Sequence, residues 1–465
     1  MKHLVFILLI LSSFLLEGQQ DTTEYVVVSD VIIEGNNVTQ PSIILRELTF
    51  SPGDTIFATK LEEELRVSKE NIQNTTLFNF VDIECLRNNN STNDVLVLIE
   101  LTERWYLWPY PYVAYADRNV NAWYEADNLE RFSYGAELKY KNFLGLQHNL
   151  NATLIAAYNQ NYALSYDIPY LTKKQRFGLE FGIGYKRDKE VAYKTENNRV
   201  LYFNGDDEFA RQSAFVFLEP YCRFGHRNRL FVNISYNNTL YHDTLCFLNA
   251  DFANEDGSRF QYIAVNVTFK NDHRDEQNYP LNGHYFEVLL EKDGFGLLET
   301  SPDLFFGKIT ADWYQPIKGR WYWASNVTMK MSDNDDVPYF FGQGLGYKND
   351  YVRTYELYVV DAMNFALMKN NLKFAILNPT TKYLPLIKNE RFAKIHFALY
   401  ANLFFDCAYS WKMSPNPTSF LDEKFIFGTG VGVDFVTYYD KVLRVEYGIN
   451  DLGETGLFIH FVAPI

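Results

Sequence analysis

The chain has 465 residues and a formal net charge of −15. It contains 38 Phe, 34 Tyr and 7 Trp, together 17% of the chain, yet its mean hydropathy is −0.24. This excludes a polytopic helical membrane protein, which needs repeated apolar runs of about 20 residues, and intrinsic disorder. The acid excess argues against nucleic acid as a partner. Four cysteines without CxxC spacing indicate neither a zinc site nor a dense disulfide framework.

One apolar run, Leu4 to Leu16, opens the chain after Lys2 and His3 and is followed by polar residues from Glu17. A short charged end, an apolar core and a polar exit are typical of a secretory signal peptide. We therefore expect residues 1–19 to be a cleaved signal, and the protein to be exported. A buried amino-terminal helix is the alternative.

Residues 22–104 mix helix and strand patterns. A β-branched strand at Val26–Ile33 is followed by two short helices, at Ser42–Leu48 and Lys60–Ser68, and by two strands, at Phe78–Leu86 and Val95–Leu101. This order predicts a small α+β domain.

Residues 105–465 are different, because segments of roughly ten residues alternate apolar and polar positions there. Examples are Phe177–Tyr185, Leu230–Tyr236, Ile395–Phe405 and Leu443–Ile449. Such alternation is typical of a transmembrane antiparallel β-barrel, for which sixteen strands fit the length, although fourteen or eighteen also fit. A secreted β-sandwich or propeller alternates too. The barrel is favoured because the inward positions are so often Gly, Asn, Asp or Lys.

No catalytic motif is present. The patterns G-x-S-x-G, H-E-x-x-H, G-x-x-x-x-G-K-[ST] and G-x-G-x-x-G do not occur. An acidic run at Asp333–Asp336 lacks a third ligand for calcium, because Val337 takes that place. We therefore expect neither an enzyme, nor a cofactor, nor a metal site.

A family likeness is carried by several segments. They are Ile33-Glu34-Gly35-Asn36, Leu77-Phe78-Asn79-Phe80-Val81, Asn142-Phe143-Leu144-Gly145, Tyr166-Asp167-Ile168-Pro169-Tyr170, Asn271-Asp272-His273-Arg274-Asp275 and Tyr279-Pro280-Leu281-Asn282-Gly283. With them the chain resembles the outer-membrane assembly and secretion superfamily of BamA, TamA and FhaC. The resemblance implies a periplasmic POTRA-like domain at 22–104 and an outer-membrane barrel at 105–465.

The same resemblance suggests a loop latch. Val352-Arg353-Thr354-Tyr355 is similar to the motif at the tip of the family's sixth loop, here around 332–363, which folds into the barrel. The family's partner motif is similar to Phe404-Phe405-Asp406-Cys407-Ala408. Asp406 is also out of phase with the apolar set Ile395–Phe405, so its carboxylate should face the lumen. We expect Arg353 to pair with Asp406, supported by Val352, Tyr355 and Phe404.

The barrel seam is the second candidate site. The expected first strand, Trp105–Ala116, contains Pro109 and Pro111, which cannot donate ladder hydrogen bonds. The last strand, Gly456–Phe461, is short and begins with glycine. A weakly paired seam would offer strand edges to a client strand.

The function implied is assembly or translocation of polypeptides at the outer membrane of a Gram-negative bacterium. Expected partners are outer-membrane lipid, unfolded or client outer-membrane proteins, and periplasmic or lipoprotein accessory subunits that bind the POTRA-like domain. The alternatives are a non-catalytic barrel scaffold of a larger complex and a plain diffusion porin.

Overall fold

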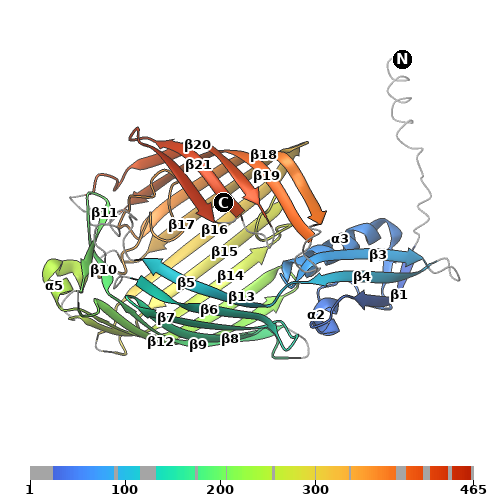
Figure 1. The fold of residues 1–465 in the computed structure, drawn as a ribbon, viewed down its shortest axis with the longest axis horizontal. Coiled ribbons are helices and arrows are strands. Elements are labelled where there is room, and N and C mark those ends of the chain that lie inside the picture. The colour runs from blue at the N-terminus through green and yellow to red at the C-terminus, as the bar shows by residue number, and fades with distance from the viewer. Residues whose placement is uncertain are drawn as a thin grey trace, which may run out of the picture.

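The computed structural model describes residues 25–87, 93–115, 132–172, 176–205, 207–253, 257–298, 300–334, 337–383, 394–411, 419–437 and 442–461. The expected signal peptide, residues 1–19, lies outside these ranges. The described chain forms a small amino-terminal domain beside one large sheet (Figure 1). None of the described helices is long and apolar enough to cross a bilayer.

The amino-terminal domain is α+β, as predicted. Its elements are β1 (Tyr25–Glu34), α2 (Pro41–Leu45), β2 (Thr55–Phe57), α3 (Ala58–Asn74), β3 (Phe78–Arg87) and β4 (Asp94–Glu103). The sheet order is β2-β1-β4-β3, with β1 and β4 parallel. Alternate residues of β4, from Val95 to Leu101, are buried in the core, which also contains Ile72 of α3.

Two element boundaries differ from the sequence-based expectation. Helix α2 ends at Leu45, because the next two residues form a turn that places Glu47 in a buried position. Helix α3 continues to Asn74, because Ile72 supplies one more apolar turn against the core. The three-residue strand β2 was not expected, since it is too short for a period-two pattern to be recognised.

The large sheet has sixteen strands, which confirms the predicted barrel architecture. They are β5 (Leu107–Tyr115), β6 (Phe132–Phe143), β7 (His148–Ala157), β8 (Gln160–Ile168), β9 (Phe177–Asp188), β12 (Arg211–Phe224), β13 (Asn228–Tyr241), β14 (Arg259–Asp272), β15 (Gly283–Asp293), β16 (Leu304–Lys318), β17 (Trp321–Ser332), β18 (Asn364–Tyr383), β19 (Lys394–Trp411), β20 (Phe425–Val436), β21 (Val442–Asn450) and β22 (Thr455–Phe461). Neighbours in this chain order pair antiparallel, from β5 to β22. Figure 1 shows these strands wrapped into a barrel.

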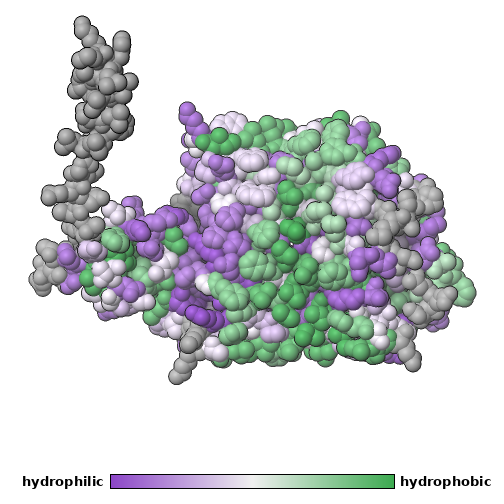
Figure 2. Space-filling model, turned by 180° about the vertical axis from the view of Figure 1, so that it is seen from behind, coloured by the Kyte–Doolittle hydropathy of each residue, from purple (hydrophilic) through white to green (hydrophobic). Residues whose placement is uncertain are grey.

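Period-two alternation sorts side chains between the two faces of this sheet. In β21, Val445, Tyr447 and Ile449 are exposed on the outside, whereas Arg444 and Glu446 are 5% and 1% exposed. Apolar residues cover the outer wall in Figure 2. The aromatic and aliphatic residues therefore form an outer layer, and the polar positions between them form the inner wall.

A cap lies at the barrel end opposite the amino-terminal domain (Figure 1). It comprises the hairpin β10 (Glu190–Glu196) and β11 (Arg199–Asn204), helix α5 (Thr244–Leu248) and the 3-10 turn η2 (Ala250–Phe252). Phe252 and Phe260 are buried there, and Phe340 of the β17–β18 loop packs against them. This aromatic cluster attaches one part of the long loop to the cap.

Candidate functional site in the barrel lumen

The β17–β18 loop (residues 333–363) returns to the inner wall of the barrel. In barrel order β17 and β18 are the eleventh and twelfth strands, so this is the sixth loop on the cap side. Val352 and Tyr355 are only 1% and 2% exposed, and Arg353 is 4% exposed. The loop tip therefore lies inside the molecule.

Arg353 and Asp406 are in direct contact. Arg353 donates from Nε to Oδ2 of Asp406 at 2.7 Å and from Nη2 to Oδ1 at 2.5 Å. Its Nη1 donates to Oε1 of Glu446 at 3.0 Å and to Oδ1 of Asn371 at 2.8 Å. The centre of the Phe404 ring lies 4.2 Å from the guanidinium carbon of Arg353. A paired, hydrogen-bonded guanidinium is the form in which a buried arginine charge is tolerated.

Strand register explains why these groups meet. Positions in register on β18, β19, β20 and β21 form rows across the inner wall. Three adjacent rows are Lys369, Asp406, Gly428 and Asn450; Asn371, Phe404, Gly430 and Gly448; and Lys373, Asn402, Gly432 and Glu446. The charged partners of Arg353 thus come from different strands, and the glycines leave room between them.

The glycines form the seat of the loop tip. A Cβ at Gly428 would collide with Thr354 Oγ1 and the Arg353 carbonyl oxygen, and one at Gly448 would lie 2.6 Å from Thr354 Cγ2. Thr354 itself has φ +79°, a left-handed conformation that is strained for a β-branched residue. The loop tip thus makes its turn at Thr354 without a glycine there.

The residues after Arg353 contact the last hairpin of the barrel. The Tyr355 hydroxyl donates to Asp451, and the Tyr358 hydroxyl donates to Oε1 of Glu454 at 2.8 Å. Oε1 of Glu356 lies 2.9 Å from Nε2 of His460 on β22. Loop and final hairpin are therefore joined through several side chains, a connection that the sequence did not reveal.

A second buried cluster lies beyond the loop tip. Arg444 donates to both oxygens of Asp434, at 2.8 and 3.0 Å. The Tyr279 hydroxyl also donates to Asp434, at 2.8 Å. Tyr279 belongs to the β14–β15 turn (residues 273–282), so this turn reaches the wall formed by the last strands. In this position the Tyr279 ring packs against the Tyr400 ring, with 4.9 Å between the two ring centres.

The two edges of the sheet carry the predicted seam residues. Pro109 and Pro111 lie on β5, in register with Leu138 and Ala136 of β6. Gly456 and Phe461 lie on β22, in register with β21. β5 and β22 end the strand order, and no backbone pairing joins them within the described residues. Every other junction of the sixteen-stranded sheet is paired over several residues.

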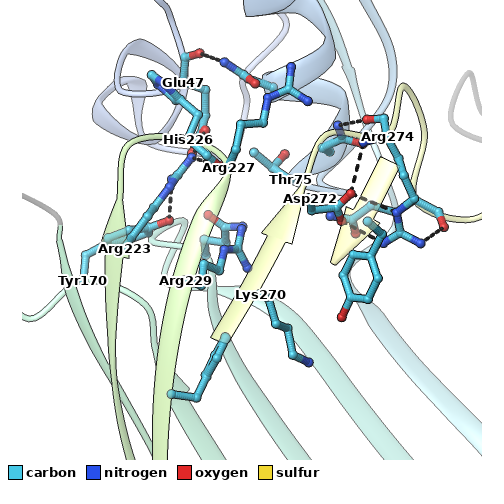
Figure 3. A pocket seen from close by; sticks show the side chains of 16 residues that line it. Glu47, Thr75, Tyr170, Arg223, His226, Arg227, Arg229, Lys270, Asp272 and Arg274 are labelled. Atoms are coloured by element: carbon cyan, nitrogen blue, oxygen red, sulfur yellow. Dashed lines mark hydrogen bonds and ion pairs between the residues drawn. The ribbon is translucent and has the colours of Figure 1, made fainter. Parts of the chain in front are cut away.

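The amino-terminal domain is attached to the barrel by a buried ion pair. Glu47 accepts hydrogen bonds from Arg223 of β12 at 2.8 and 2.6 Å. Figure 3 shows Glu47 and Arg223 facing each other across the domain boundary. Burial opposes ionisation of Glu47, but hydrogen bonds and charge from Arg223, and then Arg46, outweigh it and lower the pKa of Glu47 to about 2.

Segments singled out by resemblance also meet at this boundary. Asn142 donates to Thr39 Oγ1 at 2.9 Å, and the Gly145 carbonyl accepts from the Gln40 amide at 2.9 Å. The guanidinium of Arg46 lies 3.4 Å from the centre of the Tyr170 ring. These turns thus hold the domain against the end of the barrel.

The comparisons with known proteins agree with this architecture. Residues 26–104 match the POTRA family model, described as a surface antigen variable number repeat. The amino-terminal domain is POTRA-like. The chain also resembles the BamA, TamA and FhaC superfamily, as the sequence indicated. A comparison with curated protein sequences found no match.

Similar solved structures include CdiB from Escherichia coli, with 12% identity and a TM-score of 0.52 over 94% of this chain and 75% of that one. BamA from Haemophilus ducreyi lacking POTRA domains 1–3 has 16% identity and a TM-score of 0.48 over 94% and 83%. CdiB from Acinetobacter baumannii has 12% identity and a TM-score of 0.48 over 94% and 74%. At these identities the likeness concerns the fold.

Proposed function

We propose that this chain is an outer-membrane assembly or translocation factor that assists the insertion or passage of polypeptides through its weakly closed seam. The observation that carries the proposal is the lack of backbone pairing between β5 and β22 among the described residues. Unpaired strand edges are templates for another strand. A client strand that pairs with such an edge satisfies its backbone hydrogen bonds, which is required for strands within a bilayer.

The outer wall supports a membrane location. Exposed apolar residues occur on strands all around the sheet, including Leu154, Ile183, Ile234, Ile309 and Val431. Figure 2 shows one face of this apolar wall. Outward apolar positions that alternate with inward polar ones are the pattern of an outer-membrane barrel. In this placement the POTRA-like domain lies in the periplasm, and the cap faces outward.

The latch role of Arg353 and Asp406 belongs to the same proposal. The loop tip binds the inner wall at β19 and β21 through Arg353, and it contacts β22 through Glu356. A loop fixed in this way braces the strands next to the seam and leaves the edge of β22 unpaired. Val352, Tyr355 and Phe404 support the latch by packing and stacking around the charge.

The POTRA-like domain offers surfaces to which partners could bind. Its sheet ends at β2 and β3, and strand edges accept extended peptides through main-chain hydrogen bonds. Periplasmic clients or accessory subunits would bind there. The chemistry needed is strand pairing in lipid, with no reaction catalysed by the chain and no cofactor.

Depletion of the protein from its host tests this function. Loss of several unrelated barrels from the outer membrane is expected for an assembly factor, as measured by quantitative proteomics of purified membranes. Loss of a single surface system would instead assign the scaffold role, and an unchanged outer-membrane proteome would contradict the proposal. Planar-bilayer conductance of the purified chain separates a diffusion porin from all of these.

A further inference from the structure

A cavity of about 250 Å³ lies between the POTRA-like domain and the barrel end. Its lining includes five cationic side chains, Arg223, Arg227, Arg229, Lys270 and Arg274, against two carboxylates, Glu47 and Asp272. The chain as a whole carries a net charge of −15. A local excess of cationic side chains in an acidic protein suggests that an anionic group binds there.

Three of these cations form one row on the inner wall. Arg223 on β12 is in register with Arg229 on β13, which is in register with Lys270 on β14. Like charges directly opposite each other on neighbouring strands destabilise a sheet. Figure 3 shows Arg229 and Lys270 extending from adjacent strands into the same space.

The two outer members of the row have anionic partners. Arg223 pairs with Glu47 at 2.6 Å, and Lys270 pairs with Glu287 of β15 at 3.1 Å. The remaining carboxylate of the cavity, Asp272, is held by Arg274 at 2.7 Å. In the adjoining cavity Asp167 accepts from Tyr221 at 2.7 Å and from Asn149 at 2.9 Å, and Glu180 lies nearby.

Arg229 is the central member, and among the described residues no ion pair or side-chain hydrogen bond is formed by its guanidinium. Its side chain is exposed to the cavity. Amide and hydroxyl groups of Asn74, Thr75 and Gln277 surround the same space. Arg229 feels the charge of Asp272 in the same cavity, but its hydrogen-bonding groups have no side-chain partner among the described residues. Such a guanidinium, beside an ammonium group and neutral hydrogen-bonding groups, is suited to a carboxylate, which it can bind through two parallel hydrogen bonds.

We infer that this cationic row binds the carboxylate side chains of an acidic polypeptide segment at the barrel mouth. The inference rests on the proposed function, in which polypeptides pass from the POTRA-like domain to the barrel. Arg229 alternates with the exposed apolar residues Ile234 and Tyr236 of β13 and lies on the opposite, inner face. The site therefore opens toward the lumen and is turned away from lipid headgroups, which favours a polypeptide as the occupant.

Peptide binding to the full chain in non-ionic detergent tests this site. The probe is a rhodamine-labelled extended peptide with several glutamates, and its twin has glutamine at each of those positions. Fluorescence anisotropy should detect binding of the glutamate peptide alone, weakened by added salt. Arg229→Gln should reduce the affinity about tenfold, because glutamine can keep a single neutral hydrogen bond but loses the charge and the second parallel bond.

Lys194→Gln is the matched control, because Lys194 is an exposed cation of the β10–β11 hairpin at the other end of the barrel. It should bind the peptide like the unchanged chain. Equal binding of both peptides, or equal loss in both variants, would overturn the inference. Competition by inorganic phosphate at matched ionic strength that exceeds competition by the unlabelled glutamate peptide would also overturn it, in favour of a phosphate site.

This assay needs no insertion or transport by the chain. The binding site and the proposed function can therefore fail separately. Peptide binding with an unchanged outer-membrane proteome after depletion would refute the function alone. An altered proteome without peptide binding would refute the site alone.

Discussion

We propose that the position of the loop tip depends on Arg353. Its guanidinium contacts two carboxylates, Asp406 and Glu446, which are 0% and 1% exposed. Removing one partner of a buried ion pair leaves the other charge uncompensated, at a cost of about 3–5 kcal/mol. Arg353→Ala should therefore lower the temperature at which the folded barrel converts to its unfolded form on gels, and should expose the loop to protease.

Arg353→Lys should give an intermediate loss, because an ammonium group keeps the charge without the planar fork. Lys139→Ala removes an exposed cation of β6 and is the matched control. An Arg353→Ala barrel with unchanged heat stability and an unchanged protease pattern would contradict the latch.

The lowered pKa of Glu47 predicts how the stability of the contact between the domain and the barrel depends on pH. Its pKa in the folded chain is about 2, against an ordinary value of 4.5, so ionised Glu47 contributes roughly 3 kcal/mol. This contribution is fully present above about pH 4.5 and is lost as the pH falls toward 2. The stability difference between the native chain and Glu47→Gln, measured by thermal unfolding in maltoside detergent, should shrink over that window. A difference that stays constant from neutral pH to pH 2 would contradict this.

The sequence could predict some of these residues and not others. Asp406 could be identified because it is out of phase with the apolar residues of its strand. Arg353 could be identified because it lies in a segment similar to a family motif. Glu446 has the same phase signal within Leu443–Ile449, so parity could have identified it, yet its partner cannot be read from one strand. Glu47 and Arg223 are 176 residues apart, and only the docking of the domain on the barrel brings them together.

At the scale of elements, glycines on β20 and β21 leave the space that the loop tip occupies on the inner wall. Gly428→Ala should displace the loop tip, because the added methyl group collides with the Arg353 carbonyl oxygen and Thr354. We expect lower heat stability and faster loop proteolysis, in the same direction as Arg353→Ala.

Gly307→Ala on β16 is the control, because its Cβ would lie 3.3 Å from Leu290 Cδ2, the end of a flexible side chain, and 3.8 Å from the Leu289 carbonyl oxygen, an ordinary van der Waals distance. It should be tolerated. If Gly428→Ala and Gly307→Ala behaved alike, the glycines would not be a seat for the loop.

Helices and strands were predicted correctly where the apolar pattern continued over many residues, and their limits were missed where the pattern was short or interrupted. Alternation over about ten residues identified the barrel strands, because two sides of each strand face different surroundings. The helix at 58–74 was predicted too short, because Lys69 and Glu70 interrupt the apolar pattern before Ile72 returns to the core. The turn at 273–282 was recognised as a motif, but its contact with Asp434 spans 155 residues and has no local signal.

At the scale of the whole molecule, three features occur together. The POTRA-like domain is held at one end by Glu47, the loop tip is held inside by Arg353, and the sheet ends at β5 and β22. Prolines on β5 indicated a weak edge from sequence alone, whereas the absence of pairing to β22 in the described residues required the structure. In the proposed function, rigid attachments around one unpaired junction would concentrate strand exchange at that junction.

Site-specific photocrosslinking tests this claim most directly. A photoreactive residue at Val113 on β5 probes the seam, and one at Val216 on β12 is the matched control, since both valines are exposed on their strands. We expect newly made outer-membrane proteins to be captured from position 113 and not from position 216. Equal capture at both positions, or capture at neither while other barrels depend on this protein, would contradict it.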